Sequence, residues 1–164
     1  MNYVYDAVIE IPLKTKNKFE IDKKTNRIRL DRVLYSAMTY PAEYGYIEDT
    51  LELDGDPLDI VVISSEATFP GCIVPARVIG VLTQIDNGFL DHKIIAVVDV
   101  DPRYKEVNDL SDLSKFTLDE IKNFFQNYKE LQNIIVDVKD YDSKEKALEI
   151  IAECKKRYID KRSV

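Results

Sequence analysis

The stretch LDGDPLDIVV, residues 53–62, places three aspartates within six positions and then continues into an apolar, β-branched segment that predicts a buried strand. The carboxylates of Asp54, Asp56 and Asp59 repel one another, and burying any of them costs free energy. A cation between them would offset this repulsion. Aspartate, glycine and proline are also common turn residues, so a solvated turn before a strand explains the stretch equally well when it is considered alone.

A second acidic segment, QIDNGFLDHK at residues 84–93, also places acids where strands begin and end. Asp86 and Asp91 flank Asn87 and Gly88, a pair typical of a two-residue hairpin turn. If the predicted strands close into a barrel, both segments gather at one mouth, together with two glutamates from earlier strands. The acidic side chains expected there are Glu10, Glu20, Asp54, Asp56, Asp59, Asp86 and Asp91.

Carboxylates without neighbouring histidine or cysteine favour Mg²⁺ or Mn²⁺, and several such ions could bridge one substrate. An EF-hand calcium loop is excluded, because its sixth and twelfth positions, counted from Asp54, carry Asp59 and Ser65 instead of glycine and glutamate. The acidic segments therefore predict a magnesium site with oxygen ligands.

Other reactive side chains are few. Cys72 and Cys154 lie far apart in the sequence, which predicts reduced, buried thiols rather than a disulfide framework. His92 is the only histidine and has no evident serine or cysteine partner, so we expect an exposed loop residue. The glycines form neither a P-loop nor a dinucleotide fingerprint, and any bound phosphate must be held by side chains.

Length and composition predict one domain over residues 1–164, since 45% hydrophobic and 32% charged residues are ordinary for a globular protein. The net charge of -7 disfavours a nucleic-acid partner, because that affinity comes from clustered basic residues. No apolar run reaches the roughly 18 to 20 residues that span a bilayer, and the start MNYVYDAVIEIPLK lacks the pattern of a secretory signal. We therefore expect a cytoplasmic protein with no membrane partner.

The first two thirds of the chain consist mainly of predicted strands, which suggests a small barrel. Alternation over residues 5–13 places Glu10 on the less apolar face of a half-buried strand. Residues 18–22 and 27–31 predict a hairpin around the turn KKTN. Further strands are predicted over residues 59–64, 72–85, 93–100 and 134–141.

The last third changes to a helical period. Thr117 and Glu120 match a capping box at the start of a helix over residues 117–131. Ser143 is the expected cap of a final helix that packs its apolar side inward. The predicted apolar stripes comprise Leu118, Ile121, Phe124, Phe125, Tyr128 and Leu131 in the first helix and Ala147, Ile150, Ile151, Cys154 and Tyr158 in the second.

Basic and phenolic side chains accompany the acidic residues. Lys18 shares a strand face with Glu20, and Lys93 follows Asp91 by two positions. Hydrogen-bond donors beside metal ions suit an anionic ligand rich in phosphate, although each of these side chains could also be an ordinary surface or packing residue. The candidate donors are Lys18, Arg32, Tyr44, Lys93, Tyr128 and Lys129.

These segments together resemble a known family. EIP, KFE, DR, YPAEYGYI, DGDPLDI, IGVL, DNGFLDHKIIAV and FFQNYK occur in the order and spacing of the Mg²⁺-dependent soluble inorganic pyrophosphatases with a barrel core, over about residues 10–129. The resemblance implies a mainly β (α+β) fold, a five-stranded OB-like closed barrel with two carboxyl-terminal helices. It also implies hydrolysis of pyrophosphate to two phosphates, which draws pyrophosphate-releasing biosynthesis forward, and assembly into a homohexamer.

The resemblance also implies roles for individual residues. Asp56 matches the general base for the attacking water. The metal ligands would be Asp54, Asp59, Asp91, Asp86 and Glu10, for several Mg²⁺ ions with Mn²⁺ as a possible substitute. The phosphate-binding residues would be Lys18, Arg32, Tyr44, Lys93, Tyr128 and Lys129, with Glu20 and Tyr40 in supporting positions.

The chain departs from the family pattern at three places. Glu43 stands where members often carry asparagine, Asn87 replaces a frequent acid, and LQNIIVDVKDYD lacks the common Gly-Lys-Trp segment. Two alternatives remain open at this point: a non-catalytic OB-like module that binds a divalent ion or nucleic acid, and a catalytically inactive relative. Binding of nucleic acid by such a module would need a surface of aromatic and basic side chains on which bases stack, and the sequence shows no such surface.

Overall fold

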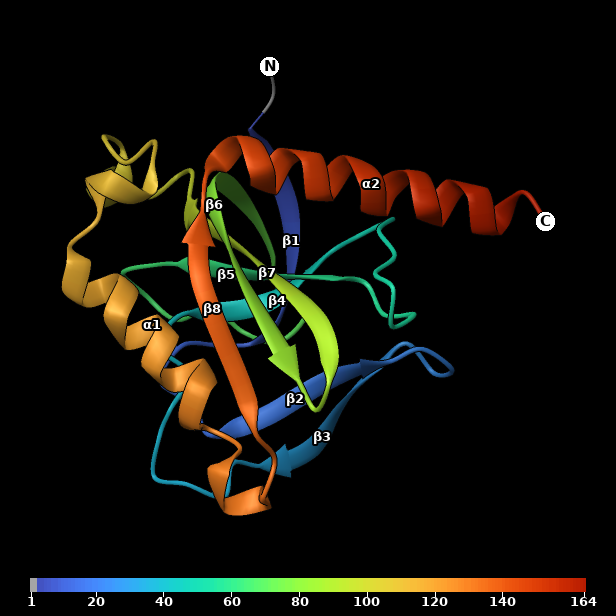
Figure 1. The fold of residues 1–164 in the computed structure, drawn as a ribbon, viewed down its shortest axis with the longest axis horizontal. Helices are drawn as coiled ribbons and strands as arrows, with labels where there is room; N and C mark the ends of the chain where they lie inside the picture. The colour runs from blue at the N-terminus through green and yellow to red at the C-terminus, as the bar shows by residue number, and fades with distance from the viewer. Residues whose placement is uncertain (1–2) are drawn as a thin grey trace.

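The computed structural model describes residues 3–164 and has a closed barrel at its centre (Figure 1). The barrel strands, in order around the ring, are β1 (Val4–Ile11), β4 (Glu43–Ile47), β5 (Leu58–Ile63), β7 (Phe89–Val98) and β6 (Ile73–Asp86). The ring is closed because β6 also pairs with β1. An additional strand, β8 (Val136–Asp142), pairs with β6 alone. The predicted five-stranded barrel is therefore confirmed.

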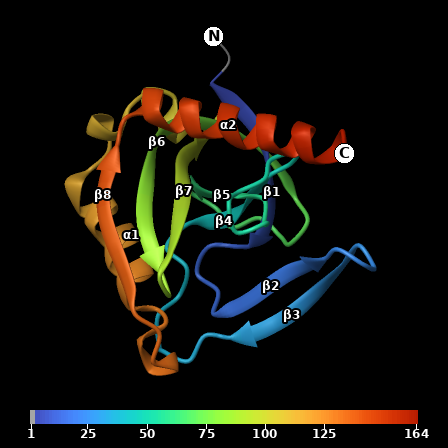
Figure 2. The ribbon, with the colours of Figure 1, turned by 45° about the vertical axis from the view of Figure 1, so that its right-hand side comes forward.

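The predicted hairpin forms, but it lies outside the barrel. Strands β2 (Asn17–Asp22) and β3 (Arg27–Val33) make a separate two-stranded sheet, which projects below the barrel in Figure 2. Its turn contains Asn26 with φ of 54°, a left-handed conformation that asparagine tolerates better than most residues. The hairpin can therefore form one wall of a cavity without belonging to the main sheet.

The segment that forms β4 carries no strand pattern that the sequence alone reveals. This strand has only five residues, and Gly45 at its centre lowers its strand propensity. A Cβ atom at Gly45 would lie 1.8 Å from the carbonyl oxygen of Val8, so only glycine allows β1 to approach. The close approach of two backbones, rather than local propensity, therefore explains this strand.

Two helices follow the barrel. Helix α1 (Lys115–Asn127) begins two residues before the predicted start, and Ser114 caps it by accepting a hydrogen bond from the backbone N–H of Phe116. The predicted capping box is therefore wrong. Leu131 is also not part of the stripe, because it lies beyond the end of α1 and is exposed. Helix α2 (Lys144–Arg162) is capped by Ser143 as predicted.

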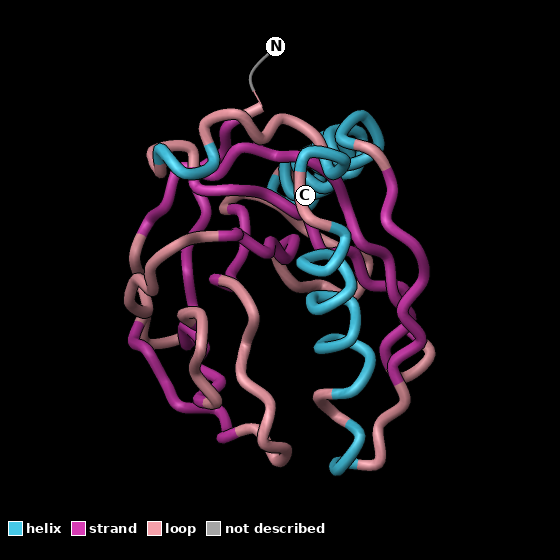
Figure 3. The backbone as a smooth tube through the Cα atoms, turned by 90° about the vertical axis from the view of Figure 1, so that its left-hand side faces the viewer, coloured by secondary structure: helices cyan, strands magenta, loops and turns pink. Residues whose placement is uncertain are grey.

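The strands carry two apolar clusters on opposite faces. Successive side chains of a strand alternate, so in β5 Ile60 packs in the cluster that contains residues of α2, and Val61 in the cluster that contains Phe124 of α1. Helix α1 runs along the outside of the barrel, on the side that faces the viewer in Figure 3. The face that packs on α1 also carries the polar residues of the site described below.

Three short 3₁₀ helices connect these elements, at Pro102–Tyr104, Leu110–Asp112 and Glu130–Gln132. Both cysteines are free thiols; Cys154 is buried as predicted, whereas Cys72 is only half-buried. Within residues 3–164, no helix is both long enough and apolar enough to span a bilayer.

Candidate active site

A cavity of about 520 Å³ lies where the barrel meets the β2–β3 hairpin. Its volume is within the range of about 300 to 1,000 Å³ that is typical of small-molecule sites. Seven carboxylates and four lysines line it, which leaves an excess of three negative charges. These residues are Glu10, Glu20, Asp54, Asp56, Asp59, Asp86, Asp91, Lys18, Lys23, Lys93 and Lys129.

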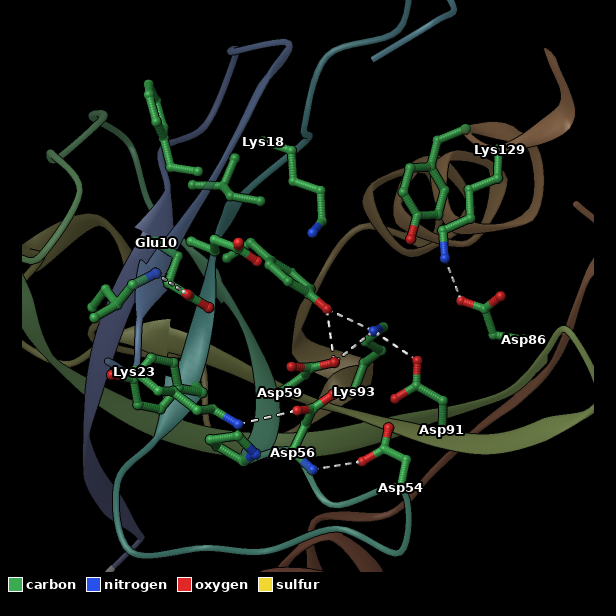
Figure 4. Close-up of a pocket in the computed structure, with 18 of the residues that line it drawn as sticks. Glu10, Lys18, Lys23, Asp54, Asp56, Asp59, Asp86, Asp91, Lys93 and Lys129 are labelled. Atoms are coloured by element: carbon green, nitrogen blue, oxygen red, sulfur yellow. Dashed lines mark hydrogen bonds and ion pairs between the residues drawn. The ribbon is translucent and has the colours of Figure 1, made fainter. Parts of the chain in front are cut away.

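The floor of the cavity, defined here as Tyr44, Asp59, Asp91 and Lys93, is centred on a buried ammonium group (Figure 4). Lys93 Nζ lies 2.8 Å from an oxygen of each of the two aspartates. It also donates a hydrogen bond of 2.6 Å to the hydroxyl of Tyr44, which in turn donates to Asp59 at 2.8 Å. The Lys93 side chain is 4% exposed, so water cannot replace these partners.

Burial and charge act in opposite directions on this floor. Burial raises the pKa of Asp59, and Lys93 counteracts part of that rise. Burial alone would lower the pKa of Lys93, but the charges of Asp59 and the neighbouring oxygen groups raise it well above its ordinary value. Burial and Asp59 also raise the pKa of Tyr44, which therefore stays a hydrogen-bond donor. The floor thus holds a permanent cation among anionic oxygens.

Strand register explains why these side chains meet. In the parallel pairing of β5 with β7, Asp59 is directly opposite Lys93. In the antiparallel pairing of β6 with β7, Gln84 is directly opposite Asp91. The buried Gln84 amide donates to Asp91 Oδ2 at 3.0 Å, and its own Oε1 has no hydrogen-bond partner among the described residues. Gln84 and Lys93 together leave the other oxygen of Asp91 available to a ligand.

A second ion pair closes one side of the cavity. Lys129 Nζ lies 2.6 Å from Asp86 Oδ2, and both side chains are largely buried. Lys129 follows Tyr128, which caps the carboxyl end of α1 and whose pKa is raised by burial. The end of α1 and the end of β6 therefore supply one lysine and one aspartate to the same wall.

The rim of the cavity, defined here as Lys23, Asp54 and Asp56, is exposed. Asp54 Oδ1 accepts a hydrogen bond of 2.9 Å from the backbone N–H of Asp56, which fixes the tight turn between them. Desolvation raises the pKa of Asp54. Asp56 faces Lys23 of the hairpin turn at 3.2 Å, with both side chains in contact with solvent. Asp56 is thus accessible to water, and among residues 3–164 its carboxylate is paired with this lysine alone.

Glu10 enters the cavity through an irregularity in β1. The register between β1 and β4 shifts between Ile9 and Ile11, and bulges of this kind commonly redirect a side chain near a functional site. Glu10 Oε2 accepts a hydrogen bond of 2.9 Å from the backbone N–H of Ile21, which links the barrel to the hairpin. Burial raises the pKa of Glu10, partly against this hydrogen bond.

Twelve of the fourteen predicted site residues line this one cavity, and Arg32 and Tyr40 do not. Arg32 contacts Asp31 Oδ2 at 2.8 Å, beside Lys18, which reaches the same oxygen at 2.9 Å. Lys18, which is opposite Arg32 on the hairpin, lines the cavity, whereas Arg32 does not. Tyr40 is buried in the aromatic group against Phe124, with ring centroids 4.7 Å apart. Neither residue is part of the lining.

Several lining residues were not predicted from the sequence. Lys23, Asn26 and Tyr46 all face the cavity. The position of Lys23 in the hairpin turn after Lys18 and Glu20 was a usable signal. Tyr46 lies on β4 directly opposite Asp59, and it was missed because the strand itself was missed.

The expectation for His92 is wrong. It lies within β7, its side chain is only 17% exposed, and Nδ1 is 2.7 Å from Oε1 of the buried Glu52. The turn that surrounds it in sequence suggested a loop, but strand β7 begins earlier, at Phe89. No property of the local sequence links residues 52 and 92, because a contact across forty positions depends on the tertiary fold.

The lining fits divalent cations through its chemistry. Mg²⁺ is commonly held by only one or two carboxylates together with water and substrate phosphates. In residues 3–164, no three acidic, imidazole or thiol groups converge on one point that could hold a metal. Instead, four of the seven carboxylates, those of Asp56, Asp59, Asp86 and Asp91, are paired with lysines. This donor set suits weakly caged ions that arrive with an anionic ligand.

Comparison with known proteins agrees with this chemistry. The family model described as inorganic pyrophosphatase matches residues 7–159. An inorganic pyrophosphatase of Halalkalibacterium halodurans is 54% identical over 155 residues, which is 94% of this chain and 95% of that protein. That of Geobacillus stearothermophilus is 48% identical over 98% of both chains.

Two solved structures have the same fold as this chain over nearly its whole length. The inorganic pyrophosphatase of Thermus thermophilus superposes with a TM-score of 0.92 at 40% identity, covering 95% of this chain and 91% of the other. That of Helicobacter pylori has a TM-score of 0.91 at 43% identity, covering 94% and 93%. The expected OB-like fold is therefore confirmed together with the barrel.

Proposed function

This chain belongs to the inorganic pyrophosphatase family, and from that premise we propose that it hydrolyses pyrophosphate to two phosphates with Mg²⁺ ions held by the carboxylates of the cavity. The observation that carries the metal dependence is the excess of three negative charges in the lining. A polyanion such as pyrophosphate would be repelled from this cavity unless cations entered with it. Mg²⁺ suits the oxygen ligands, with Mn²⁺ as a substitute.

The proposed ligands are five of the seven carboxylates that line the cavity. Asp54, Asp59 and Asp91 would hold the tighter ions, and Asp86 and Glu10 those that accompany substrate. Divalent ions bound there would neutralise phosphoryl oxygens and lower the pKa of the attacking water. Lys93 and Lys129 contact the Oδ2 atoms of Asp59, Asp91 and Asp86, so the Oδ1 atoms of these carboxylates would bind the ions.

Asp56 is the proposed general base. It is exposed to water on the rim and lies between two proposed ligands in the sequence. Its carboxylate can accept the proton from the water that attacks phosphorus. The second product leaves as phosphate, and lysines beside its oxygens offset the charge that develops on it.

The remaining donors would hold and orient pyrophosphate. The proposed set is Lys18, Lys93, Lys129, Tyr44 and Tyr128, with Glu20 in support. Arg32 could join them from behind Lys18 by exchanging its contact with Asp31 for a phosphate oxygen. Tyr40 would act by packing against the aromatic side chains that surround Tyr44.

We further propose that residues 1–164 act as one domain within a cytoplasmic homohexamer, where hydrolysis would draw pyrophosphate-releasing biosynthesis forward. Large apolar side chains that one chain leaves exposed support an oligomer. Examples outside the cavity are Phe69, Ile73, Val100 and Phe116. Light scattering should give a mass several times the 18.9 kDa of one chain. A monomer at working concentration would contradict the proposed assembly.

The direct test is phosphate release from pyrophosphate after removal of metals with a chelator. Activity should be absent without added metal and should return with Mg²⁺. Ca²⁺ prefers longer bonds and more ligands than Mg²⁺, so Ca²⁺ should compete with Mg²⁺ and inhibit. Metal-independent hydrolysis, or full activity with Ca²⁺ alone, would refute the metal assignment. Protein that binds metal without releasing phosphate would instead be a catalytically inactive relative.

A further inference from the structure

We propose that Glu52 and His92 form a positioning pair, which holds the turn carrying Asp54 and Asp56 in register with Asp91. The inference rests on the proposed function, since it concerns residues that we assign to metal and water. Neither member of the pair lines the cavity. Each would act through the residues beside it.

The pair is buried and well connected. Glu52 is 7% and His92 17% exposed at the side chain, and Nδ1 lies 2.7 Å from Oε1. An ionised carboxylate only accepts hydrogen bonds, so the Nδ1–H group of His92 is the donor. The second oxygen of Glu52 accepts a hydrogen bond of 3.2 Å from the backbone N–H of Leu53. Both oxygens of the glutamate are thus engaged.

The turn is built on the backbone of Glu52. Its N–H donates to the carbonyl oxygen of Asp56 at 2.8 Å, and its carbonyl oxygen accepts from the N–H of Gly55 at 3.1 Å. The side chain of Asp54 then accepts from the N–H of Asp56. A displacement of Glu52 would therefore be transmitted to both rim aspartates by hydrogen bonds of the same small ring.

The other end of the pair is a barrel strand. His92 lies between Asp91 and Lys93 on β7, and because side chains alternate along a strand it projects from the opposite face. The contact therefore joins the rim turn to the strand that supplies two floor residues. Groups behind metal ligands orient them, and their loss commonly weakens metal binding by about 10- to 100-fold.

Helix α2 holds the base of the loop that carries Asp54 and Asp56, without help from the Glu52–His92 pair. Loss of the pair should therefore move the tip of this loop without undocking its base. Leu51 donates its N–H to the carbonyl oxygen of Cys154 at 3.0 Å, and its own carbonyl oxygen accepts from Arg157 at 2.6 Å. The base of the loop should therefore stay docked when the pair is removed. The tip of the loop, which carries Asp54 and Asp56, would lose its alignment with β7.

The experiment measures Mn²⁺ binding to metal-free protein by calorimetry, without substrate, and the Mg²⁺ concentration for half-maximal activity. His92→Leu should weaken both by about tenfold, while KM for pyrophosphate at saturating Mg²⁺ stays unchanged. His92→Asn keeps a donor near the position of Nδ1 and should restore both to within about threefold. The double variant His92→Leu/Glu52→Leu removes the positioning pair without leaving a buried unpaired carboxylate. It replaces the single variant in the same measurements if the single variant does not fold.

Asp99→Asn is the matched control, because it removes one partner of the half-buried ion pair with Arg77, outside the cavity. It should lower stability without changing metal affinity. Parent-like metal binding in folded His92→Leu or in the double variant, or an equal loss of affinity in Asp99→Asn, would overturn the positioning pair. A parent protein without saturable Mn²⁺ binding, or Asp54→Asn with parent affinity, would overturn the proposed metal site itself.

Discussion

On the floor of the cavity the Lys93 side chain is 4% exposed between Asp59 and Asp91, whereas on the rim the side chains of Lys23 and Asp56 are 69% and 70% exposed. Both places pair lysine with aspartate at similar distances. A buried pair that loses one partner leaves an uncompensated charge, while an exposed pair contributes only about 0 to 1 kcal/mol because water and salt screen it. The floor charges are therefore fixed by the fold, and the rim charges are free to exchange partners.

The largest expected effect is on the floor. Lys93→Met should lower the free energy of unfolding of the metal-free protein by about 3–5 kcal/mol, because Asp59 and Asp91 would lose the ammonium group that compensates their burial. Denaturant unfolding in the presence of a chelator measures this loss. A change below about 1 kcal/mol would show that the floor behaves like an exposed pair and would remove the contrast with the rim.

On the rim we expect a loss of chemistry without a loss of stability. Asp56→Asn should lower kcat by at least about 100-fold, since an amide cannot accept the proton of the attacking water. Its thermal unfolding should match that of the parent. Asp140→Asn is the control, because Asp140 is an exposed aspartate that pairs with Lys122 at 3.1 Å, away from the cavity. Activity of Asp56→Asn within a few-fold of the control would exclude Asp56 as the base.

A smaller effect on metal affinity is expected for Gln84, which supports the floor residue Asp91. Gln84→Leu removes the amide that donates to Asp91 but leaves Lys93 in place. The concentration of Mg²⁺ for half-maximal activity should rise by about tenfold, in the manner of other groups behind metal ligands, with kcat recovered at saturating Mg²⁺. Gln84→Glu, which keeps the shape but adds a charge against Asp91, should be the more damaging variant. If the parent and Gln84→Leu need the same Mg²⁺ concentration for half-maximal activity, Gln84 does not orient Asp91, and Lys93 alone does.

The smallest effect belongs to the exposed lysine of the rim. Lys23→Met should change the free energy of unfolding by less than about 0.5 kcal/mol, because its contact with Asp56 is solvated. Denaturant unfolding beside Lys93→Met compares the same chemical change on the rim and on the floor. A loss of 2 kcal/mol or more, on the order of a buried interaction, would show that the hairpin depends on this pair.

Predictability differed between elements for physical reasons. The hairpin and α2 followed from local patterns, alternation in one and the Ser143 cap in the other. The start of α1 was misassigned because Ser114 and Thr117 are both acceptable caps, and only the first accepts a backbone hydrogen bond in the fold. Strand β4 was not predicted because Gly45 is required by the approach of its neighbour β1, which is far away in the sequence.

By itself, the sequence indicated the barrel through the alternation of its strands and the family through the resemblance of its motifs, and it predicted that the acidic residues gather at one mouth of the barrel. Only the tertiary structure decided how these charges are paired and buried. Lys93 lies opposite Asp59 through the register of β5 and β7, and His92 contacts Glu52 of the loop before β5. Such contacts depend on which strands become neighbours, and their strength depends on the exclusion of water, which no local pattern encodes.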